Sequence, residues 1–136
     1  MLTKLENNSI VEYNFKNFKR VILCGVPGAF TPGCTKKHLP GFANNLNELE
    51  SKGIDKVIFI ATNDAYVMDA WNTHHGHKKI DCVSDFTGEF SKSIDELVDH
   101  GPDFGKRCNR FALLIEHGNI IRKFKNPFIE DVLKEL

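Results

Sequence analysis

Apolar residues recur along this chain with two different spacings, and the spacing predicts which segments are strands and which are helices. Short runs rich in β-branched and aromatic residues predict buried strands over residues 20–26, 56–61, 80–83 and 111–116. Apolar residues three and four positions apart, or capping residues ahead of a segment, predict helices over residues 34–51, 65–72, 91–98 and 128–136. Pro40-Gly41 lies inside the first helix, and we expect it to kink or interrupt that helix.

Turn residues join the other segments into two predicted β-hairpins. The first joins residues 2–5 to 10–14 around Asn7-Asn8-Ser9, and the second joins 111–116 to 119–124 through His117-Gly118. Elsewhere strands and helices alternate, and such crossovers make parallel strand pairs, whereas the last hairpin makes an antiparallel pair. The order therefore predicts an α/β fold with a mixed central sheet flanked by helices.

Length and charge narrow the class of protein. A chain of 136 residues is long enough for one domain with both sheet faces covered, and we expect residues 1–136 to form a single domain. The chain has 18 positively and 18 negatively charged side chains, so it has no net positive charge that would favour binding to nucleic acid or to an anionic membrane. No apolar run is long enough to span a membrane, and the N-terminus lacks the pattern of a signal peptide.

The four cysteines, at positions 24, 34, 82 and 108, show no CxxC spacing. We therefore expect neither a disulfide framework nor a zinc site, and a reducing compartment is favoured. The segment His74-His75-Gly76-His77 with Cys82 suggests a metal site, but three histidines in four residues after a helix are more typical of an exposed loop. No metal and no cofactor are expected.

Cys34 is the candidate for chemistry. Two prolines and two glycines at positions 27–33 prevent a regular element from forming before Cys34, and helix-compatible residues begin there. The first turn of a helix has free backbone N–H groups and a partial positive charge, which stabilise a thiolate over a thiol. A free cysteine can also be an inert buried residue, but such a residue does not need this arrangement of breakers around it. We interpret Cys34 as reactive.

The stretch PGAFTPGC (residues 27–34) matches the PxxxTxxC motif of peroxiredoxins, and its continuation TKKHLPGF (35–42) resembles the type-5, or plant type-II, subfamily. The resemblance continues through NDAYV (63–67), SDFTGEF (84–90) and RFAL (110–113). It implies a thioredoxin-like fold in which residues 80–98 form the peroxiredoxin-type βα insertion. The chain departs from the family at its ends, because it lacks part of the usual N-terminal β segment and is short after Lys125.

The resemblance also implies roles for individual residues. Cys34 would be the peroxidatic cysteine, which attacks a hydroperoxide and becomes a sulfenic acid. Thr31 would reach the Cys34 sulfur and the peroxide with its hydroxyl, Pro27 would shield the thiolate from water, and Arg110 would supply a fixed positive charge. By itself Arg110 resembles a solvated charge at a strand end. The substrate-binding residues implied in addition are Phe30, Gly33 and His38, although His38 is also consistent with a packing or capping role.

The sequence leaves open how the sulfenic acid is reduced. The chain has no cysteine at either position where the family carries a resolving cysteine. Cys108 lies two residues before Arg110, which on an extended segment puts both on one side about 7 Å apart, so Cys108 is a possible resolving residue. Otherwise an external thiol must act, namely glutathione with glutaredoxin, or thioredoxin.

The sequence therefore predicts a thiol peroxidase for hydrogen peroxide and alkyl hydroperoxides, and by resemblance a homodimer, in the cytoplasm or a reducing organelle. A peroxide-sensing redox relay and a thioredoxin-like disulfide exchanger are the alternatives. The absence of CxxC argues against an exchanger, which needs a second thiol close by.

Overall fold

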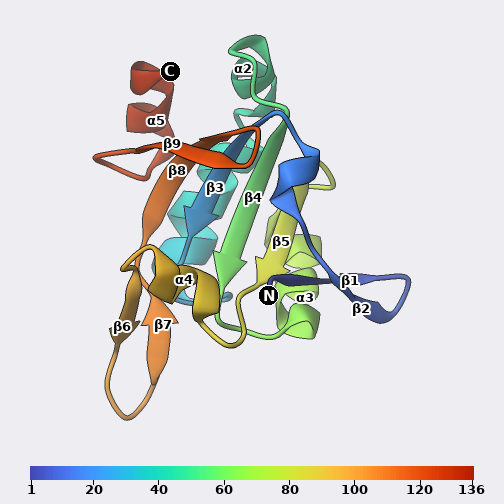
Figure 1. The fold of residues 1–136 in the computed structure, drawn as a ribbon, viewed down its shortest axis with the longest axis vertical. Coiled ribbons are helices and arrows are strands. Elements are labelled where there is room, and N and C mark those ends of the chain that lie inside the picture. Colours follow the sequence, from blue (N-terminus) through green and yellow to red (C-terminus); the bar gives the residue numbers. More distant parts are fainter.

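A mixed β-sheet forms the centre of the structure, a computed structural model that describes residues 1–136 (Figure 1). Its strands are β1 (Thr3–Glu6), β2 (Ser9–Glu12), β3 (Arg20–Gly25), β4 (Lys56–Ala61), β5 (Ile80–Ser84), β8 (Phe111–Glu116) and β9 (Asn119–Lys123). They lie side by side in the order β2-β1-β5-β4-β3-β8-β9. The parallel pairs are β3 with β4 and β4 with β5, and the neighbouring pairs on either side are antiparallel. The predicted mixed sheet is confirmed.

Both predicted hairpins are present, and their turns have the backbone that tight hairpins need. Asn7 and Asn8 have φ of 49° and 65°, and His117 and Gly118 have φ of 51° and 81°. Two consecutive residues with positive φ give a turn whose twist matches that of the flanking strands. Asparagine and glycine tolerate this conformation better than other residues do, which is why the sequence signal for these turns was reliable.

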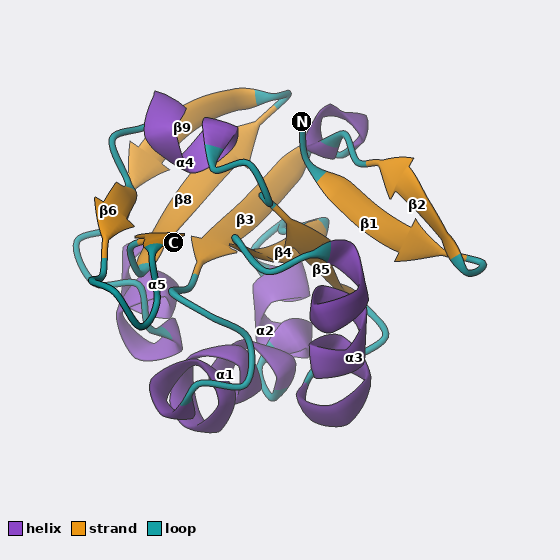
Figure 2. Ribbon diagram, turned by 90° about the horizontal axis from the view of Figure 1, so that it is seen from below, coloured by secondary structure: helices purple, strands orange, loops and turns teal.

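The helical segments are η1 (Phe15–Asn17, a 3₁₀-helix), η2 (Cys34–His38, a π-helix), α1 (Leu39–Ala43), α2 (Leu46–Ser51), α3 (Ala65–His75), α4 (Glu89–Ser93) and α5 (Ile129–Glu135). Figure 2 shows α1, α2 and α3 together on one side of the sheet and α4 on the other. The sheet is thus flanked by helices as expected, and α5 closes the chain where residues 128–136 were predicted to be helical.

The central strands alternate their side chains between two cores. Ile22 and Cys24 belong to a cluster of 22 buried residues that also contains Cys34, Phe42 and Trp71. The neighbours on β3, such as Val21 and Leu23, belong to a second cluster of 10 buried residues on the other face of the sheet. Because both faces of β3 are covered, its sequence is continuously apolar.

The helix predicted over residues 34–51 is divided at two places. The π-helix η2 gives way to α1 at Leu39, and Pro40 lies in the first turn of α1. The interruption expected near Pro40-Gly41 is therefore present as this change from π-helix to α-helix, because a proline has no N–H with which to continue the preceding turn. The chain leaves the helical path again at Asn44 and Asn45, and α2 starts at Leu46.

The helix predicted over residues 91–98 was wrong in its second half. The helix α4 ends at Ser93, and Asp95 adopts a left-handed φ of 58°, which no helix continues through. Residues Leu97–Asp99 form a short strand, β6, which pairs with β7 (Lys106–Cys108) in a separate two-stranded sheet. This β6–β7 hairpin projects from the main body of the molecule (Figure 1).

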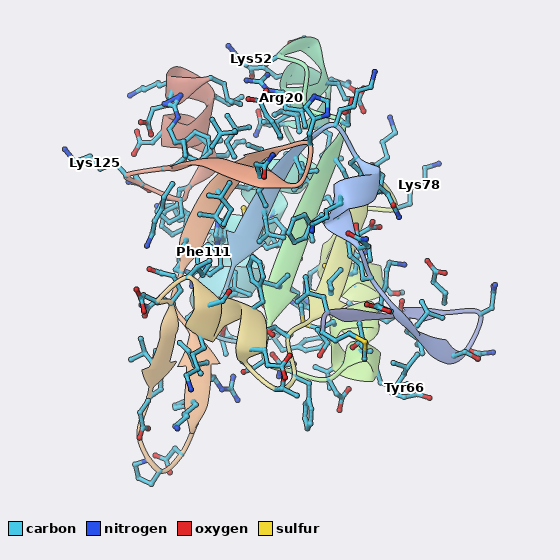
Figure 3. All side chains as sticks on the ribbon, viewed as in Figure 1. Arg20, Lys52, Tyr66, Lys78, Phe111 and Lys125 are labelled. Carbon is cyan, nitrogen blue, oxygen red and sulfur yellow. The ribbon has the colours of Figure 1, made fainter.

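The three parallel strands end at the same edge of the sheet, and the loops that follow them gather there (Figure 1). In Figure 3, Tyr66, which follows β4, lies at this end, and Arg20, the first residue of β3, lies at the opposite end beside Lys52. In open α/β sheets, ligands bind beyond the carboxyl ends of the strands. None of the helices has the length and apolar character needed to cross a bilayer.

Candidate active site

Cys34 lies beyond the carboxyl end of β3, at the first position of η2. A loop of breaker residues leads from the strand to Gly33, which has helical φ and ψ of −65° and −37°. The predicted junction of loop and helix is therefore confirmed. The thiol is 1% exposed, and the wider turn of a π-helix follows it. Such turns are uncommon and occur often at functional sites.

Arg110 brings a positive charge to this thiol from a distant part of the chain. Its Nη2 atom donates to the Cys34 sulfur at 3.0 Å. Arg110 lies just ahead of β8, which pairs with β3, so the sheet register brings it to the end of the strand before Cys34. A β-carbon added at Gly33 would lie 3.2 Å from Nη2, so glycine leaves the guanidinium room to approach. The sequence prediction that Arg110 accompanies Cys34 agrees with this arrangement.

His38 holds the other side of the guanidinium. Arg110 Nη1 donates to His38 Nδ1 at 2.9 Å, and His38 Nε2 lies 2.9 Å from the Pro127 carbonyl oxygen. A carbonyl only accepts, so Nε2 carries the proton and Nδ1 presents a lone pair to Arg110. His38 is fully buried and packs against the rings of Phe42, Phe59 and Phe128. Burial, and then the charge of Arg110, lower the pKa of His38 to about 3.

This histidine should make the protein less stable in mild acid. The unfolded state takes up a proton near pH 6.5, whereas the pKa of His38 in the folded state is about 3. Between these values only the unfolded state is protonated, so the free energy of unfolding falls by about 1.4 kcal/mol for each pH unit lost. We expect His38→Gln, which cannot take up that proton, to be destabilised near neutral pH and to lose much of this slope. Urea unfolding at several pH values measures both quantities.

The matched control for this prediction is His75→Gln, because His75 is exposed at the end of α3. That variant should keep the slope of the original protein. An unchanged slope in His38→Gln would contradict a buried neutral imidazole at this position.

The loop before Cys34 is fixed by local hydrogen bonds. Thr31 Oγ1 donates to the Gly28 carbonyl at 2.6 Å and not to the Cys34 sulfur, so the expected contact between Thr31 and the sulfur is absent here. Pro27 is partly buried, and its carbonyl accepts from Arg107 Nη1 at 3.0 Å. The opposite side of the loop is held by Asn63, whose side-chain oxygen accepts from the Ala29 N–H at 2.9 Å.

Phe30 is the large hydrophobic residue of this loop that is exposed. It has a left-handed φ of 65°, and its ring lies 5.7 Å from the ring of His75 in an edge-on contact. The histidines at the end of α3 therefore lie beside the active-site loop. No group of three or more His, Cys, Asp or Glu side chains is arranged to hold a metal ion.

Two side chains important for the geometry had no sequence signal. Trp71 donates from Nε1 to Thr35 Oγ1 at 3.0 Å and so ties α3 to the residue after Cys34. Arg107 was not singled out at all. It lies 80 residues from Pro27 in the sequence, and only the folding of the β6–β7 hairpin brings it to the loop.

The other three cysteines are buried. Burial raises the pKa values of Cys24 and Cys82, and it raises the pKa of Cys108 to about 12. Cys108 belongs to the second core cluster and donates its thiol proton to the Val26 carbonyl at 2.9 Å, whereas Cys34 belongs to the first cluster. The two thiols therefore lie in different cores, but Cys34 is among the groups that raise the pKa of Cys108, and the place of Cys108 near the active site stays a prediction.

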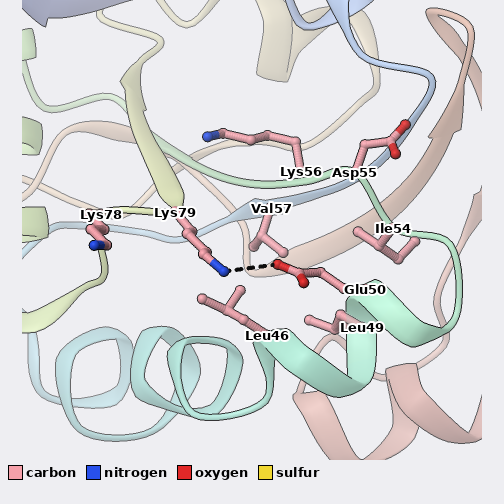
Figure 4. Close-up of a pocket in the computed structure, with 9 residues that line it drawn as sticks. All are labelled: Leu46, Leu49, Glu50, Ile54, Asp55, Lys56, Val57, Lys78 and Lys79. Atoms are coloured by element: carbon pink, nitrogen blue, oxygen red, sulfur yellow. Dashed lines mark hydrogen bonds and ion pairs between the residues drawn. The ribbon is translucent and has the colours of Figure 1, made fainter.

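A cavity of about 230 Å³ lies away from Cys34, between α2 and the amino ends of β4 and β5 (Figure 4). Lysines line it, but Lys79 pairs with Glu50 at 3.4 Å and Lys56 pairs with Asp81 at 3.4 Å. None of the residues around Cys34 reaches this cavity. We therefore assign the chemistry to the Cys34 end of the sheet.

Comparison with known proteins agrees with this geometry. Residues 3–136 match the Redoxin family. The chain is 41% identical over 129 residues to Peroxiredoxin-2D of Arabidopsis thaliana, covering 87% of this chain and 78% of that relative. Reduced Prx3 of Vibrio vulnificus in complex with hydrogen peroxide has a TM-score of 0.92 at 29% identity, covering 98% of this chain and 91% of the other. The Plasmodium falciparum antioxidant protein, a 1-Cys peroxiredoxin, has a TM-score of 0.86 at 26% identity, covering 100% and 95%.

The structural neighbours are peroxiredoxins, and the predicted thioredoxin-like fold is confirmed. The family match extends over nearly the whole chain, and the PxxxTxxC motif lies where the fold brings an arginine to a buried thiol. The chain therefore belongs to the peroxiredoxins of the plant type II kind, which are thiol peroxidases.

Proposed function

We propose that this enzyme reduces hydrogen peroxide and alkyl hydroperoxides with Cys34 as its one essential cysteine, and that an external thiol completes each cycle. The observation that carries the proposal is the 3.0 Å contact between Arg110 Nη2 and the Cys34 sulfur at the start of η2. Arg110 hydrogen-bonds a thiol and a neutral imidazole, and not a carboxylate, so its charge is available to the sulfur. An arginine stays protonated at any physiological pH and stabilises a thiolate.

In the first half of the cycle, the Cys34 thiolate attacks one oxygen of the hydroperoxide. The sulfur–oxygen bond forms as the O–O bond breaks, giving a sulfenic acid and an alkoxide or hydroxide that takes up a proton and leaves as alcohol or water. Negative charge passes from sulfur to the leaving oxygen. Fixed donors placed where that charge develops lower the barrier most.

The remaining residues of the loop have supporting roles in this proposal. The Thr31 hydroxyl donates a hydrogen bond to the Gly28 carbonyl. The lone pairs of the hydroxyl oxygen remain free to accept a hydrogen bond from the peroxide. Gly33 keeps open the space that Arg110 occupies, and His38 fixes the orientation of the guanidinium. Pro27 and Phe30 cover the loop from solvent and from the side of α3.

In the second half, an external thiol attacks the sulfenic sulfur and releases water, forming a mixed disulfide that a second thiol then reduces. Glutathione with glutaredoxin, or thioredoxin, fits this chemistry. The support for an external thiol is that all four cysteines are unpaired and that burial raises the pKa values of Cys24, Cys82 and Cys108, which makes these three thiols poor nucleophiles. A disulfide with Cys34 would also need Cα atoms within about 7 Å and β-carbons that face each other. The same burial argues against a disulfide exchanger with two cysteines.

Intact mass spectrometry tests this route. After one equivalent of hydrogen peroxide, we expect Cys34 to gain a single oxygen, and with glutathione present to gain one glutathione instead. Cys108→Ala should give the same products, because its thiol takes no part in the cycle. A loss of two hydrogens together with a linked peptide of Cys34 and Cys108 would overturn the external route.

Three further features belong to this proposal. A homodimer is supported by exposed aromatic side chains gathered beyond the ends of β3, β4 and β5, namely Phe30, Tyr66 and Phe86. A reducing compartment, such as the cytoplasm, is supported by the four unpaired cysteines. A single domain over residues 1–136 is supported by one sheet that takes strands from Thr3 to Lys123.

A further inference from the structure

A small cavity of about 210 Å³ opens against the loop that precedes Cys34. Two of its lining residues, Pro27 and Thr31, belong to that loop. The other three, His100, Phe104 and Arg107, come from the β6–β7 hairpin and its connecting turn. A molecule in this cavity would therefore touch the same loop that carries Thr31 to the peroxide, and the roles proposed above make no use of the hairpin.

Arg107 is held rigidly at the wall of this cavity. Its Nη1 donates to the Pro27 carbonyl at 3.0 Å, its Nε donates to the Phe104 carbonyl at 3.1 Å, and its guanidinium lies 5.2 Å from the centre of the Phe104 ring. These bonds use two of the five N–H donors of a guanidinium and leave Nη2 free. A β-carbon at Gly28 would lie 2.2 Å from Nη1, so only glycine admits the arginine to this position.

The lining chemistry is that of an anion site with an apolar wall. Arg107 carries no carboxylate partner, although the same hairpin has Asp99 and Asp103 in exposed positions outside the cavity. A positioned guanidinium recognises carboxylates through paired N–H groups, and the ring of Phe104 suits the hydrocarbon that carries them. Hydrogen peroxide has neither an anionic nor an apolar part, so the residues of this cavity are not suited to binding it.

We propose that Arg107 and Phe104 bind the carboxylate and the adjoining carbon chain of an organic co-substrate while its reactive end lies at Cys34. The inference rests on the proposed function. The cycle has two co-substrates with organic parts, the hydroperoxide and the reducing thiol, and a carboxylate on either satisfies the same site. The two half-reactions can be measured separately, so they identify which co-substrate the site serves.

The first arm compares a fatty-acid hydroperoxide with its methyl ester. The single tryptophan, Trp71, is bonded to Thr35 next to Cys34 and should report Cys34 oxidation by its fluorescence in stopped flow. In the original protein, the rate constant for the acid divided by that for the ester should exceed one. This ratio should decrease as salt is added, because salt screens the charge of Arg107. In Arg107→Gln the ratio of acid to ester rate constants should fall by about tenfold, the scale of one charged hydrogen bond. The ratio for Arg107→Lys should lie between those of the original protein and Arg107→Gln.

The second arm uses the enzyme already oxidised to the sulfenic acid and compares glutathione with its diester. A shift of this ratio in Arg107→Gln, with none in the first arm, assigns the site to the thiol. Lys106→Gln is the matched control, because it removes an exposed positive charge from the same hairpin outside the cavity. Because each result is a ratio, a general effect of the substitution on the loop cancels.

The inference is overturned if neither ratio depends on Arg107, or if Lys106→Gln changes the ratios as much. Hydrogen peroxide separates this failure from a failure of the proposed function. Rapid oxidation of Cys34 by hydrogen peroxide with unaltered ratios removes only the carboxylate site. A Cys34 that hydrogen peroxide does not oxidise removes the peroxidase cycle and the site with it.

Discussion

Replacing Cys34 with serine is expected to abolish peroxide turnover while the protein remains folded. Serine has nearly the same size, so the buried position at the start of η2 can accept it without a cavity. Its hydroxyl stays protonated near neutral pH and is a far weaker nucleophile than a thiolate. Loss of a nucleophile reduces turnover by about 10³-fold or more. Peroxide consumption with an added thiol reductant measures the effect, and circular dichroism checks the fold.

The matched control is a variant in which the three other cysteines, Cys24, Cys82 and Cys108, are replaced by alanine. It loses small buried groups and some stability, but it should keep turnover, because Cys34 is the cysteine that hydrogen-bonds Arg110. Residual turnover above a trace in Cys34→Ser would contradict the assignment of the nucleophile. Rapid oxidation of Cys34 without turnover by any thiol would instead indicate a peroxide-sensing relay.

The parts of this fold that the sequence predicted well are those with strong local causes. The apolar runs of β3 and β4 are covered on both faces, and a short apolar run rich in β-branched residues is typical of a buried strand. The hairpin turns need residues that accept positive φ, and these residues are visible in the sequence. Cys34 could be located because prolines and glycines both end one element and delay the next.

The parts that were mispredicted depend on contacts made at long range. The β6–β7 hairpin contains three residues in each strand, too few for a period to distinguish a strand from a helical turn. The packing of His38 was expected and is present, but its bond to Arg110, which joins residues 72 positions apart, was not expected. Its partner on the other side, Pro127, is 89 positions away. No local pattern encodes such a pairing, and only the completed sheet brings these groups together.

Replacing Arg110 with methionine is expected to slow the attack of Cys34 on hydrogen peroxide by about 10²–10³-fold, the scale for removing one preorganised donor from a reacting centre. Methionine keeps much of the buried volume of arginine but carries no charge. The guanidinium 3.0 Å from the sulfur favours the thiolate and then the leaving oxygen, and both effects are lost together. Stopped-flow oxidation of Cys34 by hydrogen peroxide measures the decrease.

The same substitution should also change His38, which distinguishes a specific loss from general damage. Without Arg110, the Nδ1 lone pair of His38 is buried with no donor, and the positive charge that helps to lower its pKa is gone. The pKa of His38 should rise, so part of the stability lost in mild acid should return.

Arg110→Lys keeps the charge but cannot reach both Cys34 and His38 as a guanidinium fork does, so its oxidation rate should lie between those of the original protein and Arg110→Met. Arg122→Met, on the exposed strand β9, is the matched control and should keep the full rate. An oxidation rate in Arg110→Met equal to that of Arg122→Met would mean that the guanidinium beside Cys34 does not activate it.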